Sequence, residues 1–101
     1  MDLHLAGLRA LVSGGTRGIG RAVVTTLVAE GAQVAFCARD ADAVAATAAE
    51  LGAGGGTVIG SVADVSDGAA VAGWVTSSAA ALGGIDILVA NVSAMSTADR
   101  A

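Results

Sequence analysis

The feature that most constrains this chain is the stretch LRALVSGGTRGIG, at residues 8–20. A short apolar run is followed by a turn that contains Gly14, Gly15, Gly18 and Gly20, and a helical pattern begins near Gly18. Glycine has no Cβ, so the backbone of such a turn can bend sharply and approach a ligand closely. The first N–H groups of the following helix lack acceptors within the helix and lie at the positive end of its dipole. The pattern therefore predicts a strand, a turn and a helix that bind a phosphate group.

Strands and helices are expected to alternate along the chain. Apolar runs predict strands at residues 8–13, 33–38, 57–62 and 85–91, and helical spacing predicts helices at residues 18–30, 41–51 and 67–82. Such an alternation gives a parallel sheet with right-handed crossover connections. If the first two helices cover one face and the third covers the other, the strand order is 3-2-1-4. The predicted fold class is therefore α/β, a Rossmann-type parallel sheet with helices on both faces and a ligand site at the carboxyl ends of the strands.

The apolar positions of each helix predict which side faces the sheet. These positions are Ile19, Ala22, Val23 and Leu27 in the first helix, Val44, Ala45, Ala48 and Leu51 in the second, and Val71, Trp74, Val75, Ser78 and Leu82 in the third. Trp74 lies on the stripe of the third helix and is expected in the core. Asp40 is expected to cap the second helix, and Ser66 the third.

Composition excludes several classes of function. The 101 residues carry a net charge of -4, which argues against a nucleic-acid or anionic-membrane partner. No apolar run approaches the roughly 18 residues that a membrane helix needs. Cys37 is the only cysteine, so no disulfide framework is expected and a reducing compartment fits. We therefore expect a cytoplasmic protein that binds neither nucleic acid nor membrane.

The glycine turn has the spacing GxxxGxG, at Gly14, Gly18 and Gly20, and Val23 stands where a GxGxxG pattern would need its third glycine. The turn SGGTRGIG resembles the TGxxxGIG loop of the short-chain dehydrogenase/reductase family. Three further segments agree with that family in order and spacing, namely CARD at residues 37–40, ADV at 63–65 and ILVAN at 87–91. The resemblance implies a nicotinamide-dependent oxidoreductase that acts on a carbonyl or an alcohol, like the 3-oxoacyl reductases.

The resemblance also implies which residues bind the cofactor. They come from four segments and are Gly14, Thr16, Arg17, Gly18, Ile19, Gly20, Arg39, Asp64, Val65 and Asn91. Asp64 resembles the aspartate that accepts a hydrogen bond from the adenine amino group, with the Val65 backbone beside it. An equally open alternative is that Asp64 is a loop residue that caps the third helix.

The end of the second strand distinguishes NADP from NAD. An acidic side chain there would accept hydrogen bonds from the ribose hydroxyls and repel a 2′-phosphate, but Ala38 occupies that position. Arg39 follows it, and a guanidinium can bind a phosphate through two parallel hydrogen bonds. Arg17 could approach the same phosphate from the turn. NADP is therefore expected, and NAD less so; the alternative is that Arg39 is only a solvated residue at the end of the strand.

The residues of the reaction itself are absent. The family supplies a proton from a tyrosine beside a lysine, but the sequence contains no tyrosine and all five of its basic residues are arginine. We therefore assign no catalytic residue and no metal site. Residues 1–101 are expected to be a partial NAD(P)-binding domain, with a lead-in at 1–7, the strands and helices at 8–91, and a loop at 92–101 that leads to a missing carboxyl-terminal half.

Two interpretations of such a chain remain open. In the first, it is the NADP(H)-binding portion of an oxidoreductase, and a small carbonyl or alcohol substrate binds only if the missing half is present. In the second, it is a non-catalytic truncated product that is inert, binds a nucleotide, or forms a homo-oligomer through the exposed edge of its last strand.

Overall fold

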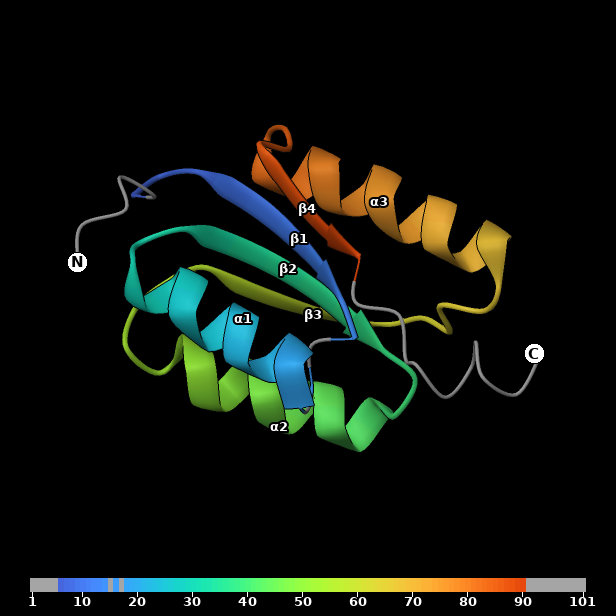
Figure 1. The fold of residues 1–101 in the computed structure, drawn as a ribbon, viewed down its shortest axis with the longest axis horizontal. Helices are drawn as coiled ribbons and strands as arrows, with labels where there is room; N and C mark the ends of the chain where they lie inside the picture. Colours follow the sequence, from blue (N-terminus) through green and yellow to red (C-terminus); the bar gives the residue numbers. More distant parts are fainter. Residues whose placement is uncertain (1–5, 15, 17, 91–101) are drawn as a thin grey trace.

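Four parallel strands form the centre of the protein. In the computed structural model, which describes residues 6–14, 16 and 18–90, the strands are β1 (Arg9–Ser13), β2 (Gln33–Ala38), β3 (Val58–Val62) and β4 (Ile87–Ala90). Their order in the sheet is β3-β2-β1-β4, and each neighbouring pair is parallel (Figure 1). The helices are α1 (Gly18–Ala29), α2 (Ala41–Gly52) and α3 (Gly68–Leu82). The predicted fold class and strand order are confirmed.

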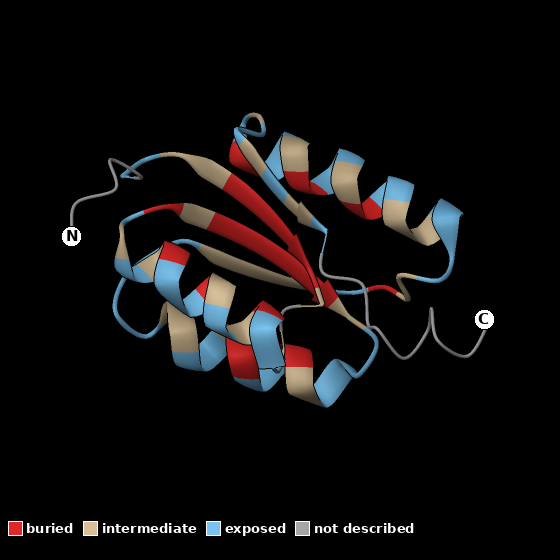
Figure 2. Ribbon diagram, viewed as in Figure 1, coloured by how far each residue is buried: buried red, intermediate tan, exposed pale blue. Residues whose placement is uncertain are grey.

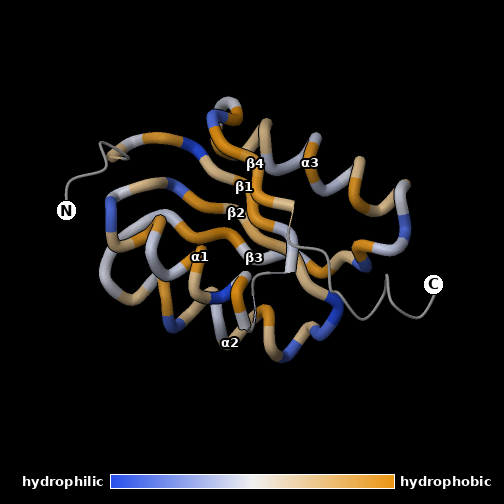
Figure 3. The backbone as a smooth tube through the Cα atoms, in the orientation of Figure 1, coloured by the Kyte–Doolittle hydropathy of each residue, from blue (hydrophilic) through white to orange (hydrophobic). Residues whose placement is uncertain are grey.

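The helices lie on both faces of the sheet, with α1 and α2 on one side and α3 on the other (Figure 1). The core is therefore divided into two clusters, and the side chains of each central strand alternate between them. The first cluster joins α1 and α2 to the sheet and contains Ala10, Val12, Val24, Leu27, Ala32, Val34, Phe36 and Val44. The second joins α3 to the sheet and contains Leu11, Ala35, Cys37, Ala63, Trp74 and Leu82. Burial is concentrated in β1 and β2, which are also strongly apolar (Figures 2 and 3).

The buried side of α1 agrees only in part with the predicted one. Leu27 is buried and Val23 packs against the first cluster, as expected. Gly20, Val24 and Leu27 face the sheet, whereas Ile19 is 75% exposed. Ala22 is also exposed. The sequence GIGRAVVTTLVA is apolar around most of the helix, so its hydrophobic pattern did not define one face. Gly20 lacks a side chain and gave no apolar signal, so its burial was not predicted.

Helices α2 and α3 follow their predictions more closely. Val44 is buried in α2 as expected, but Thr47 is buried beside it and Ala45 is exposed. The buried residues of α3 are Trp74, Ser78 and Leu82, all on the predicted stripe. Trp74 is 5% exposed and is therefore a core residue.

Helix α2 packs tightly on β3 at Gly60. A Cβ atom at this position would lie 2.8 Å from Cγ1 of Val44 and 2.9 Å from Cζ of Phe36. Real Cβ atoms do not approach other atoms so closely. The absence of a side chain at Gly60 is therefore what allows the ring of Phe36 and the helix to fill this part of the core.

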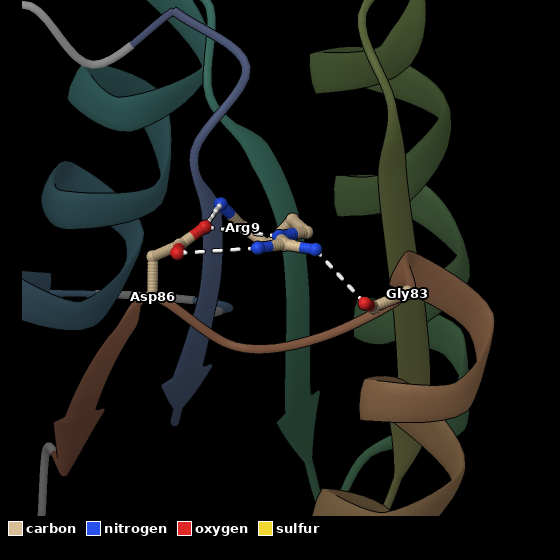
Figure 4. A network of polar contacts seen from close by, with 3 residues as sticks. All are labelled: Arg9, Gly83 and Asp86. Atoms are coloured by element: carbon tan, nitrogen blue, oxygen red, sulfur yellow. Dashed lines mark hydrogen bonds and ion pairs between the residues drawn. The ribbon is translucent and has the colours of Figure 1, made fainter.

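An arginine clamp joins the start of β1 to the start of β4. We use this name for Arg9, Gly83 and Asp86 (Figure 4). The backbone N–H and Nε of Arg9 donate to Oδ2 of Asp86 at 2.8 and 2.9 Å, and Nη2 donates to Oδ1 at 3.2 Å. Nη1 of Arg9 donates to the carbonyl oxygen of Gly83, at the end of α3, at 2.8 Å. The clamp therefore holds β4 in register with β1 and satisfies the carbonyl of Gly83, the residue that caps the carboxyl end of α3.

The sheet ends at β4, which is an exposed apolar edge in the described part of the chain. Leu88 is 58% exposed, and it pairs in register with Leu11, which is fully buried. Leu88 is thus on the face that α3 covers, but α3 leaves it in contact with solvent. None of the described helices is both long and apolar enough to span a membrane.

Candidate functional site

The carboxyl ends of the four strands lie together at one edge of the sheet, where the arrowheads point in Figure 1. Ser13, at the end of β1, is in register with Cys37 of β2 on one side and with Ala90 of β4 on the other. The connections from β1 lead to α1 on one face, and those into β4 come from α3 on the other. We call this end of the sheet, where the four strands have their carboxyl ends, the site edge. It is the switch point at which open α/β sheets bind their ligands.

The structure places most of the predicted site residues at this edge. They are Gly14, Thr16, Gly18, Ile19 and Gly20 after β1, Arg39 after β2, and Asp64 and Val65 after β3. Arg17 and Asn91 lie outside the described residues, as do the lead-in at 1–5 and the predicted loop at 92–101. The assignment of these residues to a cofactor remains a prediction.

Two described glycines of the turn, Gly14 and Gly18, have the backbone conformation that favours glycine. Gly14 has a φ of 73° and Gly18 a φ of 61°, both in the left-handed region that favours glycine. The N–H of Gly14 donates to the carbonyl oxygen of Cys37 at 2.8 Å, so the turn begins directly from the β1–β2 ladder. A Cβ at Gly18 would meet nothing within 4 Å, and it would project into open space.

The start of α1 is suited to an anion. The first turn of the helix contains no acidic residue, so no carboxylate competes there for the positive end of the dipole. Gly20, in the same turn, is buried. The backbone is thus arranged so that a phosphate could approach the turn.

The end of β2 carries one cation and one capping carboxylate. Arg39 is exposed, directly after Ala38. Oδ1 of Asp40 accepts hydrogen bonds from the backbone N–H groups of Asp42, at 3.0 Å, and Ala43, at 3.2 Å. Asp40 is therefore the N-cap of α2, as predicted, and its carboxylate is engaged with the helix.

The turn after β3 differs from the predicted one. The N-cap of α3 is Asp67, whose Oδ1 accepts from the N–H groups of Ala69 and Ala70 at 3.0 and 3.2 Å. The predictions that Ser66 or Asp64 caps this helix are both wrong. Ser66 instead donates to Asp64, and because Ser66 and Asp67 are adjacent residues of good capping types, the sequence alone did not distinguish them.

Asp64 carries a negative charge that its hydrogen bonds with Ser66 stabilise. The pKa of its carboxyl is lowered, first by the hydrogen bond from the backbone N–H of Ser66 and then by that from the Ser66 hydroxyl. The charge of Arg39 lowers this pKa further. The carboxyl ends of the strands therefore carry a guanidinium after β2 and a carboxylate after β3.

The fold and the site edge together define a doubly wound α/β nucleotide-binding domain with its glycine turn after the first strand. The family described as short chain dehydrogenase matches residues 9–101. The chain therefore belongs to the short-chain dehydrogenase/reductase family.

Several relatives show how far this similarity extends. A 2-dehydro-3-deoxy-L-rhamnonate dehydrogenase (NAD(+)) from Sphingomonas sp. strain SKA58 is 46% identical over 84 residues, which cover 83% of this chain and 32% of that protein. The crystal structure of L-sorbose reductase from Gluconobacter frateurii, complexed with NADPH and L-sorbose, is similar with a TM-score of 0.86 and 33% identity, over 92% of this chain and 36% of that one.

A short chain dehydrogenase from Burkholderia cenocepacia J2315, in complex with NADP, has a TM-score of 0.79 and 45% identity, over 83% of this chain and 35% of that one. The chain thus spans about a third of the length of these relatives. The part that it matches is the amino-terminal nucleotide-binding region of a family whose members bind nicotinamide dinucleotides.

Proposed function

We propose that this chain is the NADP(H)-binding portion of an oxidoreductase that transfers hydride between NADP(H) and a carbonyl or alcohol substrate. The observation that carries the choice of cofactor is the end of β2, where Ala38 is followed by the exposed cation Arg39. Asp40 is the nearest acid in the sequence, and its carboxylate caps α2. A 2′-phosphate at the end of β2 would meet the guanidinium of Arg39. It would not be repelled by residue 38, which is alanine and carries no carboxylate.

The described residues fit a dinucleotide. The pyrophosphate would lie against the turn, where Gly14 and Gly18 have positive φ and a Cβ at Gly18 would occupy open space. When bound, a reduced nicotinamide supplies hydride to a carbonyl carbon. The role of this chain's residues would be to bind and orient the cofactor, because the sequence contains no tyrosine and no lysine that could provide the proton as the family does. The catalytic residues of the proposed reaction are therefore expected outside these 101 residues.

The relatives support a nicotinamide dinucleotide but differ in its kind. The structures of the sorbose reductase and of the Burkholderia dehydrogenase contain NADPH and NADP, whereas the Sphingomonas dehydrogenase is named for NAD(+). The residue types at the end of β2 are therefore the basis of the proposal, and the relatives alone are not.

We expect the 101-residue chain to bind NADPH more tightly than NADH, and Arg39→Ala to remove most of this difference. A hydrogen-bonded charge pair contributes about 1.5–3 kcal/mol, so the preference should fall by about tenfold to a hundredfold. Isothermal titration calorimetry gives both affinities, and the melting temperature should rise with either ligand that binds the native state.

Ala49→Glu is the matched control for Arg39→Ala. It changes the net charge by the same amount at an exposed position in the second half of α2, away from the carboxyl ends of the strands. It should leave the ratio of the two affinities unchanged. An equal affinity for NADPH and NADH in the unchanged chain would contradict the choice of NADP, and no binding of either would contradict the proposed function as a whole.

A second candidate function rests on the edge of β4. The edge carries Leu88, which is 58% exposed, and two copies of the same edge could pair around a two-fold axis. In this case the chain is a subunit-pairing module, and its partner is a second copy of itself.

Leu88→Lys tests this pairing, because lysine on an edge strand opposes edge-to-edge association. Light scattering coupled to size-exclusion chromatography should show a dimer for the unchanged chain and a monomer for the variant. Val62→Lys is the control, since Val62 is also 58% exposed but lies on β3 at the opposite edge. A monomeric unchanged chain, or a dimer that only Val62→Lys dissociates, would exclude pairing through β4.

A further inference from the structure

Ser66 binds one oxygen of the Asp64 carboxylate with two donors. Its backbone N–H donates to Oδ1 of Asp64 at 2.9 Å, and its hydroxyl Oγ donates to the same oxygen at 2.7 Å. Within the described part of the chain these are the hydrogen bonds that the Asp64 side chain accepts. The second oxygen, Oδ2, is therefore available to a ligand.

The turn that carries Asp64 is anchored on both sides. Before it, the N–H of Ala63 donates to the carbonyl oxygen of Ala38 at 2.9 Å, and Ala63 is buried in the second cluster of the core. After it, the N–H of Asp67 donates to the carbonyl oxygen of Asp64 at 2.9 Å, and Asp67 caps α3. The Asp64 backbone is thus fixed, so the direction of its carboxylate depends on the two donors of Ser66, of which the hydroxyl is the one that a substitution can remove.

We propose that Ser66 is a positioning residue for recognition of the nucleotide base, and that it directs Oδ2 of Asp64 toward the exocyclic amino group of adenine. A carboxylate can only accept hydrogen bonds, so Oδ2 favours an amino donor and repels a carbonyl oxygen. Ser66 occupies Oδ1 and removes the rotational freedom of the carboxylate, which makes this discrimination sharper. The inference rests on the proposed nucleotide-binding function.

The test compares NADPH with reduced nicotinamide hypoxanthine dinucleotide phosphate, in which a carbonyl oxygen replaces the adenine amino group. The unchanged chain should bind NADPH about tenfold or more tightly than the hypoxanthine analogue, because a hydrogen bond to a charged group is lost. Ser66→Ala should reduce this ratio to about threefold or less, since the hydroxyl donor is lost and only the backbone N–H of residue 66 still holds Oδ1 of Asp64. Ser66→Thr keeps both donors and should retain the ratio.

Ser77→Ala is the matched control serine. The Ser77 hydroxyl donates to the carbonyl oxygen of Trp74 at 3.2 Å, on α3 and outside the site edge, so its loss should not change the ratio. Circular dichroism of each variant checks that the fold is retained. A structural effect of Ser66→Ala would weaken both ligands equally, whereas the positioning role weakens NADPH selectively.

The outcomes separate this inference from the function on which it rests. If the unchanged chain binds neither nucleotide, the proposed function fails and the inference fails with it. If the unchanged chain binds both nucleotides equally, nucleotide binding stands and base recognition by Asp64 is excluded. If the preference for NADPH persists in Ser66→Ala, or is lost in Ser66→Thr as well, Ser66 does not position Asp64.

Discussion

Replacing Gly60 with alanine is expected to lower the free energy of unfolding by about 1–3 kcal/mol, the usual effect of adding a methyl group to a filled core. The new Cβ would lie 2.8 Å from Val44 and 2.9 Å from Phe36. The Phe36 ring is fully buried, and valine in a helix has one strongly preferred rotamer. Neither neighbour can move without disturbing the packing of α2 on the sheet. Urea unfolding followed by circular dichroism measures the change.

A double-mutant cycle with Val44→Ala tests the cause. Val44→Ala removes the closest of the contacts, so the double variant should be more stable than the sum of the two single effects predicts, by about 0.5–3 kcal/mol. Gly73→Ala is the control, because its Cβ would meet nothing within 4 Å on α3. That substitution should raise stability by about 0.5–1 kcal/mol through helix propensity. Strict additivity in the cycle would show that Val44 is not the obstacle.

Replacing Gly84 with alanine is the second change with a large expected effect. Gly84 has a φ of 147°, a region that is almost confined to glycine, and such strain typically costs about 1–3 kcal/mol. A Cβ there would also lie 2.8 Å from Nη1 and 3.0 Å from Cζ of Arg9, so the guanidinium must move away from its partners. Thermal unfolding should show a lower midpoint for Gly84→Ala than for Gly83→Ala. Gly83 has a φ of 87°, and its Cβ would lie 3.9 Å from Arg9, an ordinary contact.

The difference in unfolding midpoint between Gly84→Ala and Gly83→Ala should depend on pH. This dependence identifies how much of the difference comes from the loss of the arginine clamp. The hydrogen bonds and charge of Arg9 hold the pKa of Asp86 below its usual value. A carboxyl whose pKa is lower in the folded state stabilises the fold above its unfolded pKa, about 3.9 for aspartate, and this contribution is lost as the pH falls through the folded pKa. The difference between the two variants should therefore be largest near neutral pH and shrink below about pH 4. A difference that is the same at pH 7 and in acid would show that backbone strain alone causes it.

Much of the fold followed from the sequence because its local signals agree with one another. The strand of residues 33–38 was predicted with its observed ends, Gln33–Ala38, since apolar residues fill it and glycine precedes it. The strand order followed from the alternation of strands and helices and the placement of helices on both faces. At the site, the positive φ of Gly14 and Gly18 agrees with the glycine turn that the sequence predicts.

The features that were missed depend on contacts between distant segments or on a choice between similar neighbours. The last strand begins at Ile87, two residues later than predicted, because Asp86 is held by Arg9 before the ladder starts. Nothing local marks these two residues as partners. The exposure of Ile19 and the burial of Gly20 depend on how α1 is rotated against the sheet, which a helix with apolar residues on several sides does not specify.

The central position of β1 has a consequence for how the chain is made. β1 leaves the ribosome before the other three described strands. One of its two neighbours in the sheet is β4, and Arg9 lies 77 residues before its clamp partner Asp86. At a synthesis rate of about 5–20 residues per second, about 4–15 s pass between the appearance of the two residues. During that time β1 can pair with β2, while its other edge stays open in the nascent chain. A strand that is almost wholly buried in the finished protein therefore has an open edge during translation and needs protection from aggregation until β4 is made.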